Sequence, residues 1–255
     1  MRVISWNVNG VRSAIRHGLL DWLERERPDV LCLQETRVDP ATLPESARRP
    51  SGYESSWAAG ERPGYAGVAT CARAPVAAWR EGLGVERFDR EGRVLRADLG
   101  GLALYNVYFP NGKSGPERLA YKLDFCAAFL AHIDAEAAAG QSVVFCGDVN
   151  TAHRPIDLAR PAANERVSGF LPIERAWLDR WREHGWVDSF RHLHPDARGA
   201  YTWWSPFARA RERNVGWRLD YCFIHERLLP RLRGAGMYAD ASGSDHCPVW
   251  LDLDL

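Results

Sequence analysis

The chain has 255 residues, of which 46% are hydrophobic and 26% charged, a composition typical of a globular protein with one large domain or at most two. Its 33 basic residues are balanced by 33 acidic ones, so a net charge of zero gives no support to a generic cationic nucleic-acid-binding protein. No apolar run approaches the roughly 18 residues of a membrane helix, and no signal peptide precedes the first apolar run. We therefore expect a cytoplasmic protein that does not contact a membrane.

Apolar runs of strand length alternate with helical patterns along the chain. The predicted strands are 2–6, 29–34, 66–72, 102–108, 143–147, 219–224 and 248–253. Three helices are predicted, at about 13–27, at about 116–139 and at 172–184. Ser13 would cap the first, Gly140 would end the second and Gly185 would end the third. Strands that are apolar throughout are covered on both faces. We therefore predict a single α/β catalytic domain over residues 1–255, with sheets packed together and helices outside.

The six cysteines are predicted to be small buried hydrophobic residues. They include no Cys-x-x-Cys pair, and Cys32, Cys146 and Cys222 lie inside apolar runs. We expect neither disulfides nor a zinc site.

Glu35 follows the second predicted strand and is the best candidate metal ligand. A carboxylate at the end of a buried run needs a partner, and Mg²⁺ prefers oxygen ligands, often with one or two carboxylates. The alternative is a salt bridge from Glu35 to Arg37 or Arg12.

Asp148 and Asn150 follow the strand at 143–147. On an extended segment, residues two apart point to the same side, where a carboxylate and an amide would orient a water for attack on phosphorus. The alternative is an ordinary turn rich in Asp and Asn.

Asp245 and His246 add a second carboxylate and an imidazole before the last strand. A histidine donates well to a phosphate oxygen when a carboxylate holds its other nitrogen, and Asp220 is the candidate for that role. The alternative is that Asp220 is a strand-edge charge paired with Arg218.

Tyr108 and Asn111 place a phenol and an amide near the turn that follows the strand at 102–108. A plain Pro-Asn-Gly turn is the alternative interpretation. Each of these signals is modest, but together they place oxygen or imidazole groups beside several strands, an arrangement that suits a hard metal ion and a phosphate ester.

A set of segments in these regions resembles the exonuclease III family of apurinic/apyrimidinic (AP) endonucleases, and the set covers nearly the whole chain. The segments, in chain order, are Ser5-Trp6-Asn7-Val8-Asn9-Gly10, Leu33-Gln34-Glu35-Thr36, Val107-Tyr108-Phe109-Pro110-Asn111-Gly112, Gly147-Asp148-Val149-Asn150-Thr151-Ala152-His153, Trp217-Arg218-Leu219-Asp220-Tyr221 and Ser244-Asp245-His246-Cys247-Pro248. Two further segments, Ile156-Asp157-Leu158-Ala159 and Ser168-Gly169-Phe170, also resemble that family.

The resemblance implies a four-layered α/β sandwich, in which two mixed sheets pack face to face with helices outside. It also implies Mg²⁺-dependent hydrolysis of the phosphodiester 5′ of an abasic site, leaving a 3′-hydroxyl, with Mn²⁺ able to substitute. The implied partner is double-stranded DNA with abasic sites or blocked 3′ ends, bound by a monomer. The balance with 3′→5′ exonuclease and 3′-phosphatase activity does not follow from the sequence.

The resemblance also assigns roles to individual residues. The residues expected at the metal are Glu35, Asn7, Asp245, Asp148 and Asn150. Those expected at the reacting phosphate are Asp148, which would activate or align the water, Asn150, which would orient it, His246, braced by Asp220, and Tyr108 and Asn111. Trp203 and Trp217 would line a pocket for the flipped abasic sugar, with core packing as the alternative.

The sequence departs from the family pattern at two positions. Asn9 stands where some members carry aspartate, which leaves a second metal position open. Ser114, next to Lys113, stands where some members place a long basic side chain that probes the duplex.

The run Arg209, Arg211 and Arg213 is interpreted either as a grip on DNA phosphates or as a solvated loop.

Two other functions compete with this interpretation. One is another phosphoesterase of the same fold, such as a non-specific nuclease or an inositol or sphingolipid phosphoesterase. The other is an inactive DNA-binding module, which is disfavoured because Glu35, Asp148 and His246 are all present.

Overall fold

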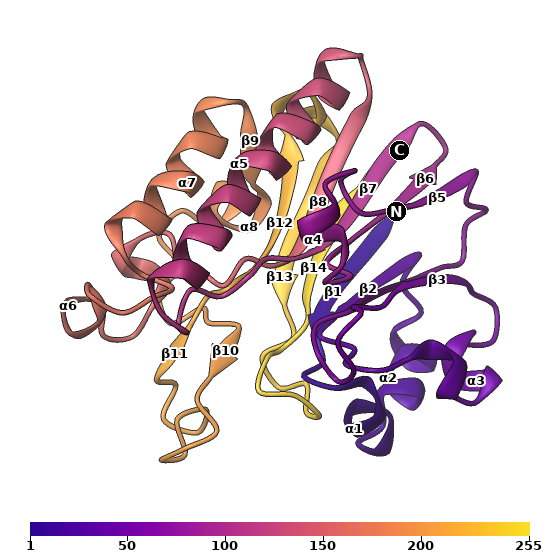
Figure 1. The fold of residues 1–255 in the computed structure, drawn as a ribbon, viewed down its shortest axis with the longest axis horizontal. Coiled ribbons are helices and arrows are strands. Elements are labelled where there is room, and N and C mark those ends of the chain that lie inside the picture. The colour runs from indigo at the N-terminus through magenta and orange to yellow at the C-terminus, as the bar shows by residue number, and fades with distance from the viewer.

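Two six-stranded sheets pack face to face, with helices outside, in the computed structural model of residues 1–255 (Figure 1). The first sheet has the order β13-β14-β1-β2-β4-β3, and its strands are β1 (Arg2–Asn7), β2 (Val30–Gln34), β3 (Glu54–Ala58), β4 (Val68–Ala72), β13 (Leu232–Met237) and β14 (Val249–Leu253). The second has the order β5-β6-β7-β8-β12-β9, and its strands are β5 (Ala78–Glu81), β6 (Val94–Leu99), β7 (Leu102–Tyr108), β8 (Ser142–Asp148), β9 (Trp186–Asp188) and β12 (Asp220–His225).

The helices flank these sheets, and a small hairpin projects from one end. The hairpin pairs β10 (Trp203–Trp204) with β11 (Gly216–Trp217). The α-helices are α1 (Val11–Arg16), α2 (Leu19–Glu26), α3 (Glu45–Arg48), α4 (Glu86–Asp89), α5 (Pro116–Ala138), α6 (Pro161–Asn164), α7 (Pro172–Glu183) and α8 (Ser189–Leu193). The 3₁₀ turns are η1 (Pro40–Thr42), η2 (Pro155–Asp157) and η3 (Glu226–Arg231).

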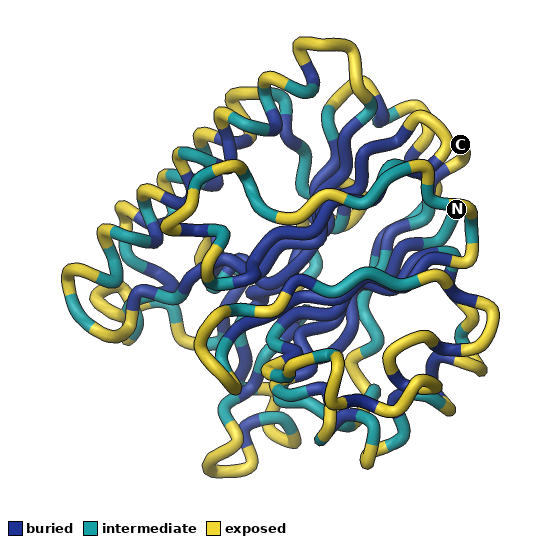
Figure 2. The backbone as a smooth tube through the Cα atoms, turned by 45° about the vertical axis from the view of Figure 1, so that its right-hand side comes forward, coloured by how far each residue is buried: buried dark blue, intermediate teal, exposed yellow.

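Three apolar layers hold this arrangement together. One lies between the sheets and includes Val3, Cys32, Val144 and Ile224. A second joins α5 and α7 to the second sheet, and a third joins α1 and α2 to the first sheet. Figure 2 shows the central strands as the buried part of the chain, with exposed residues on the loops and outer helix faces. This is the four-layered α/β sandwich that the family resemblance implied.

All seven predicted strands are present, each within two residues of its expected bounds, and the helices at 116–139 and 172–184 are confirmed as α5 and α7. The single helix over 13–27 is wrong. The chain forms α1 and α2 instead, because Gly18 adopts a left-handed φ of 90° between them, and Ser13 lies inside α1 and does not cap it. All six cysteines are buried free thiols. No helix combines the length and the apolar character needed to cross a bilayer.

The sheets bring the polar chain segments to one edge of the layer between them. The parallel pair β1–β2 sets Asn7 beside Gln34, and the parallel pair β7–β8 sets Tyr108 beside Asp148. The antiparallel pair β8–β12 then sets Asp148 opposite Asp220. Both sheets are therefore mixed, and their strand ends deliver side chains to a single place.

Candidate active site

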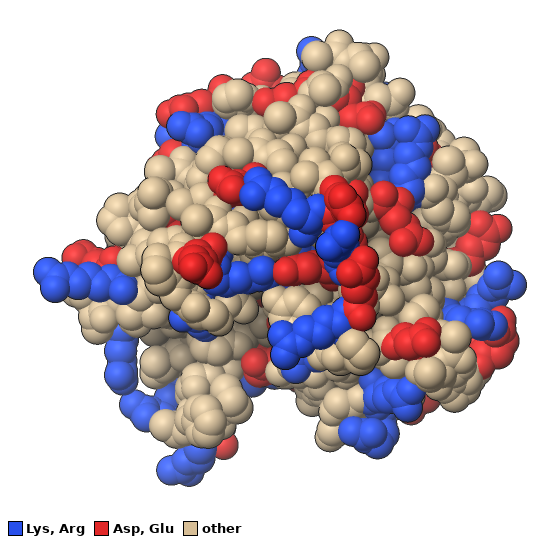
Figure 3. Space-filling model, in the orientation of Figure 1, with Lys and Arg blue, Asp and Glu red and all other residues tan.

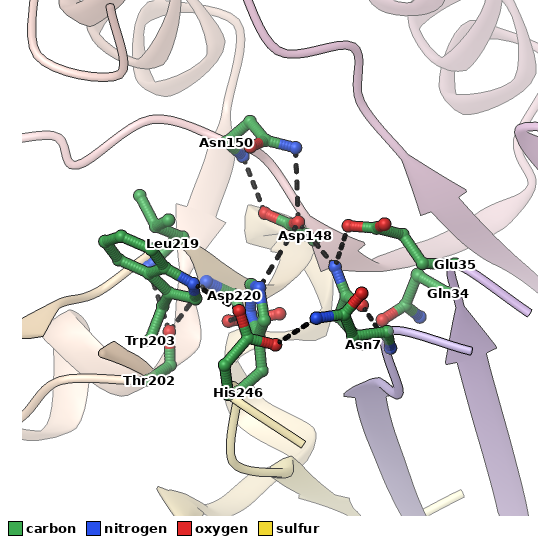
Figure 4. A network of polar contacts seen from close by, with 12 residues as sticks. Asn7, Gln34, Glu35, Asp148, Asn150, Thr202, Trp203, Leu219, Asp220 and His246 are labelled. Carbon is green, nitrogen blue, oxygen red and sulfur yellow. Dashed lines mark hydrogen bonds and ion pairs between the residues drawn. The ribbon is translucent and has the colours of Figure 1, made fainter. Parts of the chain in front are cut away.

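The carboxylates of Glu35 and Asp148 lie at the edge of the layer between the two sheets, and both accept a hydrogen bond from the side-chain amide of Asn7. The Nδ2 of Asn7 donates to Glu35 Oε1 and to Asp148 Oδ2, at 2.8 Å in each case (Figure 4). The Oδ1 of Asn7 is turned away and accepts the N–H of Asn9 at 3.0 Å. In this arrangement Asn7 bridges the two acids through its nitrogen, whereas a metal-ligand role would require its oxygen to face them.

Glu35 forms the salt bridge to Arg37 that was the alternative interpretation, and it also accepts a hydrogen bond from Asn7. One carboxylate oxygen faces Asn7 and Asp148, and the other accepts Arg37 Nε at 2.9 Å. Burial raises the pKa of Glu35, but the Arg37 guanidinium, the Asn7 amide and His246 outweigh it and leave the pKa below its usual value. Glu35 is therefore an ionised carboxylate at neutral pH. Its left-handed φ of 50° marks the sharp exit of the chain from β2.

Asp148 is almost fully buried, and its charge is poorly compensated. Burial raises its pKa to about 7; His246 opposes the rise, whereas the carboxylates of Asp220 and Glu35 add to it. Perturbed carboxylates of this kind are typical of functional sites.

His246 is held by Asp220, as the sequence predicted. Its Nδ1 lies 2.8 Å from Asp220 Oδ2, and its Nε2 lies 4.0 Å from Asp148 Oδ2. Burial lowers the pKa of His246, but Asp220, with further help from Asp148 and Asp245, outweighs burial and raises it to about 10. The imidazole therefore carries a proton at neutral pH. The alternative pairing of Asp220 with Arg218 is wrong, because Arg218 pairs with Asp157 and Asp188.

Asn150 folds back onto Asp148. Its backbone N–H donates to Asp148 Oδ1 at 2.8 Å, and its side-chain Nδ2 lies 3.2 Å from Oδ2 of the same carboxylate. The expected extended geometry is wrong at this residue, since β8 ends at Asp148 and Asn150 has a φ of 53°. The two side chains nevertheless meet, through the Asp/Asn turn that was the alternative interpretation.

Tyr108 lies beside this cluster, whereas Asn111 has no contact with it. Burial and the Glu35 carboxylate raise the pKa of Tyr108 well above its usual value, so the phenol keeps its proton. The guanidinium of Arg93 stacks 4.6 Å from the Tyr108 ring centroid. The Oδ1 of Asn111 accepts only the N–H of Lys113, at 3.4 Å.

The side chains present fit a divalent metal ion. Glu35 and Asp148 each offer a carboxylate oxygen, and these atoms and a ring nitrogen of His246 lie within 4.8 Å of one another. Because His246 is protonated, the two carboxylates are the candidate ligands. Burial and the carboxylates of Asp220 and Glu35 raise the pKa of Asp148, so additional positive charge beside it would favour its ionised form. A divalent ion would supply that charge, and carboxylate oxygens are ligands that hard cations prefer.

Asp245 lies outside this set. Its two oxygens accept Asn9 Nδ2 and Trp203 Nε1, both at 2.9 Å. Burial raises its pKa, but His246 and these two donors outweigh burial and keep the carboxylate ionised. As arranged, Asp245 orients Trp203.

A cavity of about 410 Å³ opens next to the acids, and both predicted tryptophans line it. Trp203 and Trp217 are cross-strand partners in the β10–β11 hairpin, with ring centroids 6.5 Å apart, and the Trp203 ring lies 6.5 Å from that of His246. Asn150 lines the same cavity, so the acid cluster and the cavity share a wall. Both tryptophans are also packed against a small apolar cluster, as the alternative interpretation expected.

The three arginines of the hairpin are not equivalent. The guanidinium of Arg211 donates to the carbonyls of Ser244, Ala239 and Ala241 and stacks on Trp204, so it fastens the hairpin to the body of the protein. For Arg211 the expectation of a phosphate grip therefore has no structural support. Arg209 is 80% exposed at its side chain, and Arg213 lines the cavity.

Other residues at this cavity were not identified from the sequence. Ser168, Gly169 and Leu219 line its wall, and Lys113 lies 5.1 Å above the Trp203 ring centroid. Lys113 was noted only as a neighbour of Ser114, and Ser168-Gly169-Phe170 was noted as a segment that resembles the family, without a role for its residues. Figure 3 shows acidic and basic side chains interspersed on this face, with basic ones reaching out at the hairpin end, in keeping with the zero net charge.

Comparisons with known proteins find similar sequences and similar folds. The model of the endonuclease/exonuclease/phosphatase family matches residues 4–246. An exodeoxyribonuclease of Bacillus subtilis is 41% identical over the full length of both chains, and the DNA repair nuclease APEX1 of Danio rerio is 40% identical over 99% of this chain and 82% of that protein.

Solved structures with the same fold include an AP endonuclease from Archaeoglobus fulgidus, with a TM-score of 0.90 and 29% identity, covering all of both chains. They also include a 3′ phosphatase from Neisseria bound to a product DNA hairpin, with a TM-score of 0.92 and 26% identity, again covering all of both chains.

Proposed function

This chain belongs to the endonuclease/exonuclease/phosphatase family, and from that premise we propose that it is a metal-dependent DNA-repair nuclease that hydrolyses the phosphodiester 5′ of an abasic site. The observation that carries this proposal is the position of Asn150, which donates to Asp148 and also lines the aromatic cavity. A group held in that cavity would present its neighbouring phosphate to the acids. An abasic sugar suits a narrow aromatic cavity, because it has no base to accommodate and none to unpair.

In this proposal the chain's own residues share the work of hydrolysis. Asp148 aligns the attacking water and accepts its proton, and Asn150 keeps the carboxylate oriented. His246, protonated and held by Asp220, donates to a phosphate oxygen as negative charge develops there. Tyr108 adds a neutral phenol donor, and Asn111 an amide at the phosphate. Glu35 and Asp148 would hold the divalent metal ion, proposed to be Mg²⁺, which would supply positive charge for the reacting phosphate.

The DNA partner is proposed to lie across the hairpin and the cavity mouth. Cations there include Arg209, which is 80% exposed in an ion pair with Glu212, and Arg213 and Lys113, which line the cavity. We further propose that the chain acts as a monomeric cytoplasmic enzyme with one catalytic domain over residues 1–255.

The direct test uses a duplex oligonucleotide with one central tetrahydrofuran abasic analogue, with Mg²⁺ or with EDTA. The expected result is a single Mg²⁺-dependent cut on the 5′ side of the analogue, and far slower cutting of the same duplex without the lesion. Equal cutting of both duplexes would indicate a non-specific nuclease. Hydrolysis of an inositol phosphate or of sphingomyelin, with no incision, would replace the proposal by another phosphoesterase activity.

A further inference from the structure

Lysine is rare in this chain, and one of its lysines is buried beside the proposed active site. The sequence has two lysines and 31 arginines. Lys122 lies on α5 with only 1% of its side chain exposed, and it pairs with Glu174 of α7, whose side chain is 0% exposed. Charged side chains are almost never fully buried without a specific set of partners.

The ammonium of Lys122 has three acceptors within hydrogen-bond distance. They are the backbone carbonyl of Asn150 at 2.8 Å, Thr151 Oγ1 at 2.7 Å and Glu174 Oε1 at 2.7 Å. An ammonium has three donors, so every one is used. The planar guanidinium that the chain uses elsewhere presents five donors in a fixed fork and does not match this compact set.

The carboxylate of Glu174 extends the connection to the cavity. Its Oε1 also accepts Ser168 Oγ at 3.0 Å, and its Oε2 accepts the N–H of Gly169 at 2.6 Å and of Leu171 at 3.2 Å. Ser168 and Gly169 line the cavity, and a Cβ added at Gly169 would lie 3.4 Å from the Trp217 ring. One buried ion pair therefore joins the wall of the cavity to the segment that follows Asp148.

Asn150 needs such support. Its φ of 53° is a left-handed conformation that non-glycine residues adopt at a cost. Its N–H and side chain are fixed by Asp148 and by the carbonyl of Phe109, while its own carbonyl is fixed by Lys122. Asp148 is the last residue of β8 and Phe109 directly follows β7, whereas Lys122 holds Asn150 from helix α5.

We propose that Lys122 and Glu174 are positioning residues, which hold Asn150 in its left-handed conformation and thereby keep its amide on Asp148. Neither touches the substrate, since both are buried behind the cavity wall. The activity measurements below rest on the proposed function, but the spectroscopic one does not.

Single substitutions cannot test this proposal, because removing one partner leaves a buried charge unpaired and destabilises the fold. The double variant K122M/E174Q removes both charges. Its new side-chain amide at position 174 keeps an oxygen acceptor for the N–H groups of Gly169 and Leu171, whereas the thioether at position 122 leaves the Asn150 carbonyl without its donor. Thr151→Val is the matched control, because it removes one Lys122 acceptor and leaves the contact with Asn150 in place.

The expected result for K122M/E174Q is a melting temperature close to that of the wild type, unchanged affinity for abasic DNA, and a single-turnover incision rate lower by about tenfold or more. K122Q/E174Q, which restores one amide donor, should recover part of that rate. Asn150→Ala should lower the incision rate of K122M/E174Q by a much smaller factor than it lowers the rate of the wild type. The reason is that the effects of substitutions in residues that act as a unit are not additive. The proposal would be overturned by a wild-type incision rate in a folded K122M/E174Q. It would also be overturned if the fold-losses in rate from K122M/E174Q and from Asn150→Ala multiplied in the combined variant, as they do for independent residues.

A measurement without substrate separates this proposal from the proposed function. With selective ¹⁵N-asparagine labelling, the backbone and side-chain amide signals of Asn150 should move in K122M/E174Q and stay in place in Thr151→Val. Unmoved Asn150 signals in the double variant would overturn the positioning role, even if the wild type cuts abasic DNA. A wild type that does not cut abasic DNA would refute the proposed function and leave this test standing.

Discussion

Asp148 and Asp220 are direct cross-strand partners on β8 and β12, and the imidazole of His246 lies between their carboxylates. The two acids therefore differ only in their surroundings. Asp220 holds His246 Nδ1 at 2.8 Å, whereas Asp148 lies 4.0 Å from Nε2 and has its pKa raised to about 7 by burial. The pairing of β8 with β12 therefore places two carboxylates with different roles side by side. Asp220 holds the protonated His246, and Asp148 has a pKa suited to accepting a proton near neutral pH.

Glu35→Gln should weaken the dependence of incision on Mg²⁺, because it removes a carboxylate at the proposed metal site while keeping the acceptor for Asn7. The measurement is incision rate against Mg²⁺ concentration, where we expect a higher half-saturating concentration and lower turnover. Glu24→Gln, at an exposed position on α2, is the control. An unchanged titration curve would remove Glu35 from the metal site.

Arg209→Ala and Arg213→Ala should each reduce the slope of log affinity against log salt by roughly 1, as expected for the loss of one phosphate contact. Arg211→Ala should instead lower the melting temperature, because its guanidinium holds three backbone carbonyls. Filter binding at several salt concentrations checks the first two. Wild-type slopes for both variants would mean that the hairpin arginines are only a solvated loop.

Asp157→Asn should reduce stability in a pH-dependent way. Burial raises the pKa of Asp157, but Arg218 and Arg191 outweigh it and lower the pKa to about 2. A lowered pKa stabilises the fold above the unfolded-state value near 3.8, and this contribution is lost as the pH falls through about 2. At about 1.4 kcal/mol per pKa unit the contribution is on the order of 2 kcal/mol.

Urea unfolding of the wild type and Asp157→Asn between pH 5 and pH 2 measures this contribution. The difference in unfolding free energy should be full at pH 5 and shrink toward pH 2. Asp196→Asn, at an exposed position without an ion pair, should show no such trend. A difference that stays constant with pH would contradict the lowered pKa of Asp157.

The sequence predicted the strand ends of this site well, because continuous apolar runs such as 143–147 mark buried strands whatever their neighbours are. The edge strands β3, β5, β9 and β13 were not predicted, since their residues are largely half-buried or exposed. The interior strand β6 was not predicted because Arg96 and Asp98 interrupt its apolar residues. The turn at Asn150 was only the alternative interpretation, because partners distant in the sequence, such as Lys122, contribute to its φ of 53°.

Side-chain partnerships were the least predictable part of the site. The pair Lys122–Glu174 joins residues 52 positions apart on different helices, and helical spacing treats Lys122 as one more surface cation. Arg211 looked like its neighbours Arg209 and Arg213, although only the fold brings three backbone carbonyls to its guanidinium. The pairing of Asp220 with His246 was predicted, but the sequence left a salt bridge from Asp220 to Arg218 as the alternative, and the fold excludes it by pairing Arg218 with Asp157 and Asp188.

Trp217→Ala should lower incision at an abasic analogue much more than it lowers 3′-phosphate removal from a nicked duplex, because the cavity wall encloses the abasic sugar. Both rates should be measured on one preparation with a near-native melting temperature. Trp177→Ala, half-buried on α7, controls for general loss of an aromatic side chain. An equal fall in both rates would show that Trp217 supports the site without selecting the lesion.

The most direct test of hydrolysis by a water that Asp148 aligns is a single turnover on abasic duplex in H₂¹⁸O, with both products analysed by mass spectrometry. We predict one ¹⁸O atom in the 5′-phosphate of the downstream product and an unlabelled 3′-hydroxyl upstream. The same pattern should form more slowly in Asp148→Asn, by a factor on the order of 10² or more. Strand cleavage without ¹⁸O in the phosphate, or an unchanged rate in Asp148→Asn, would contradict the proposed reaction.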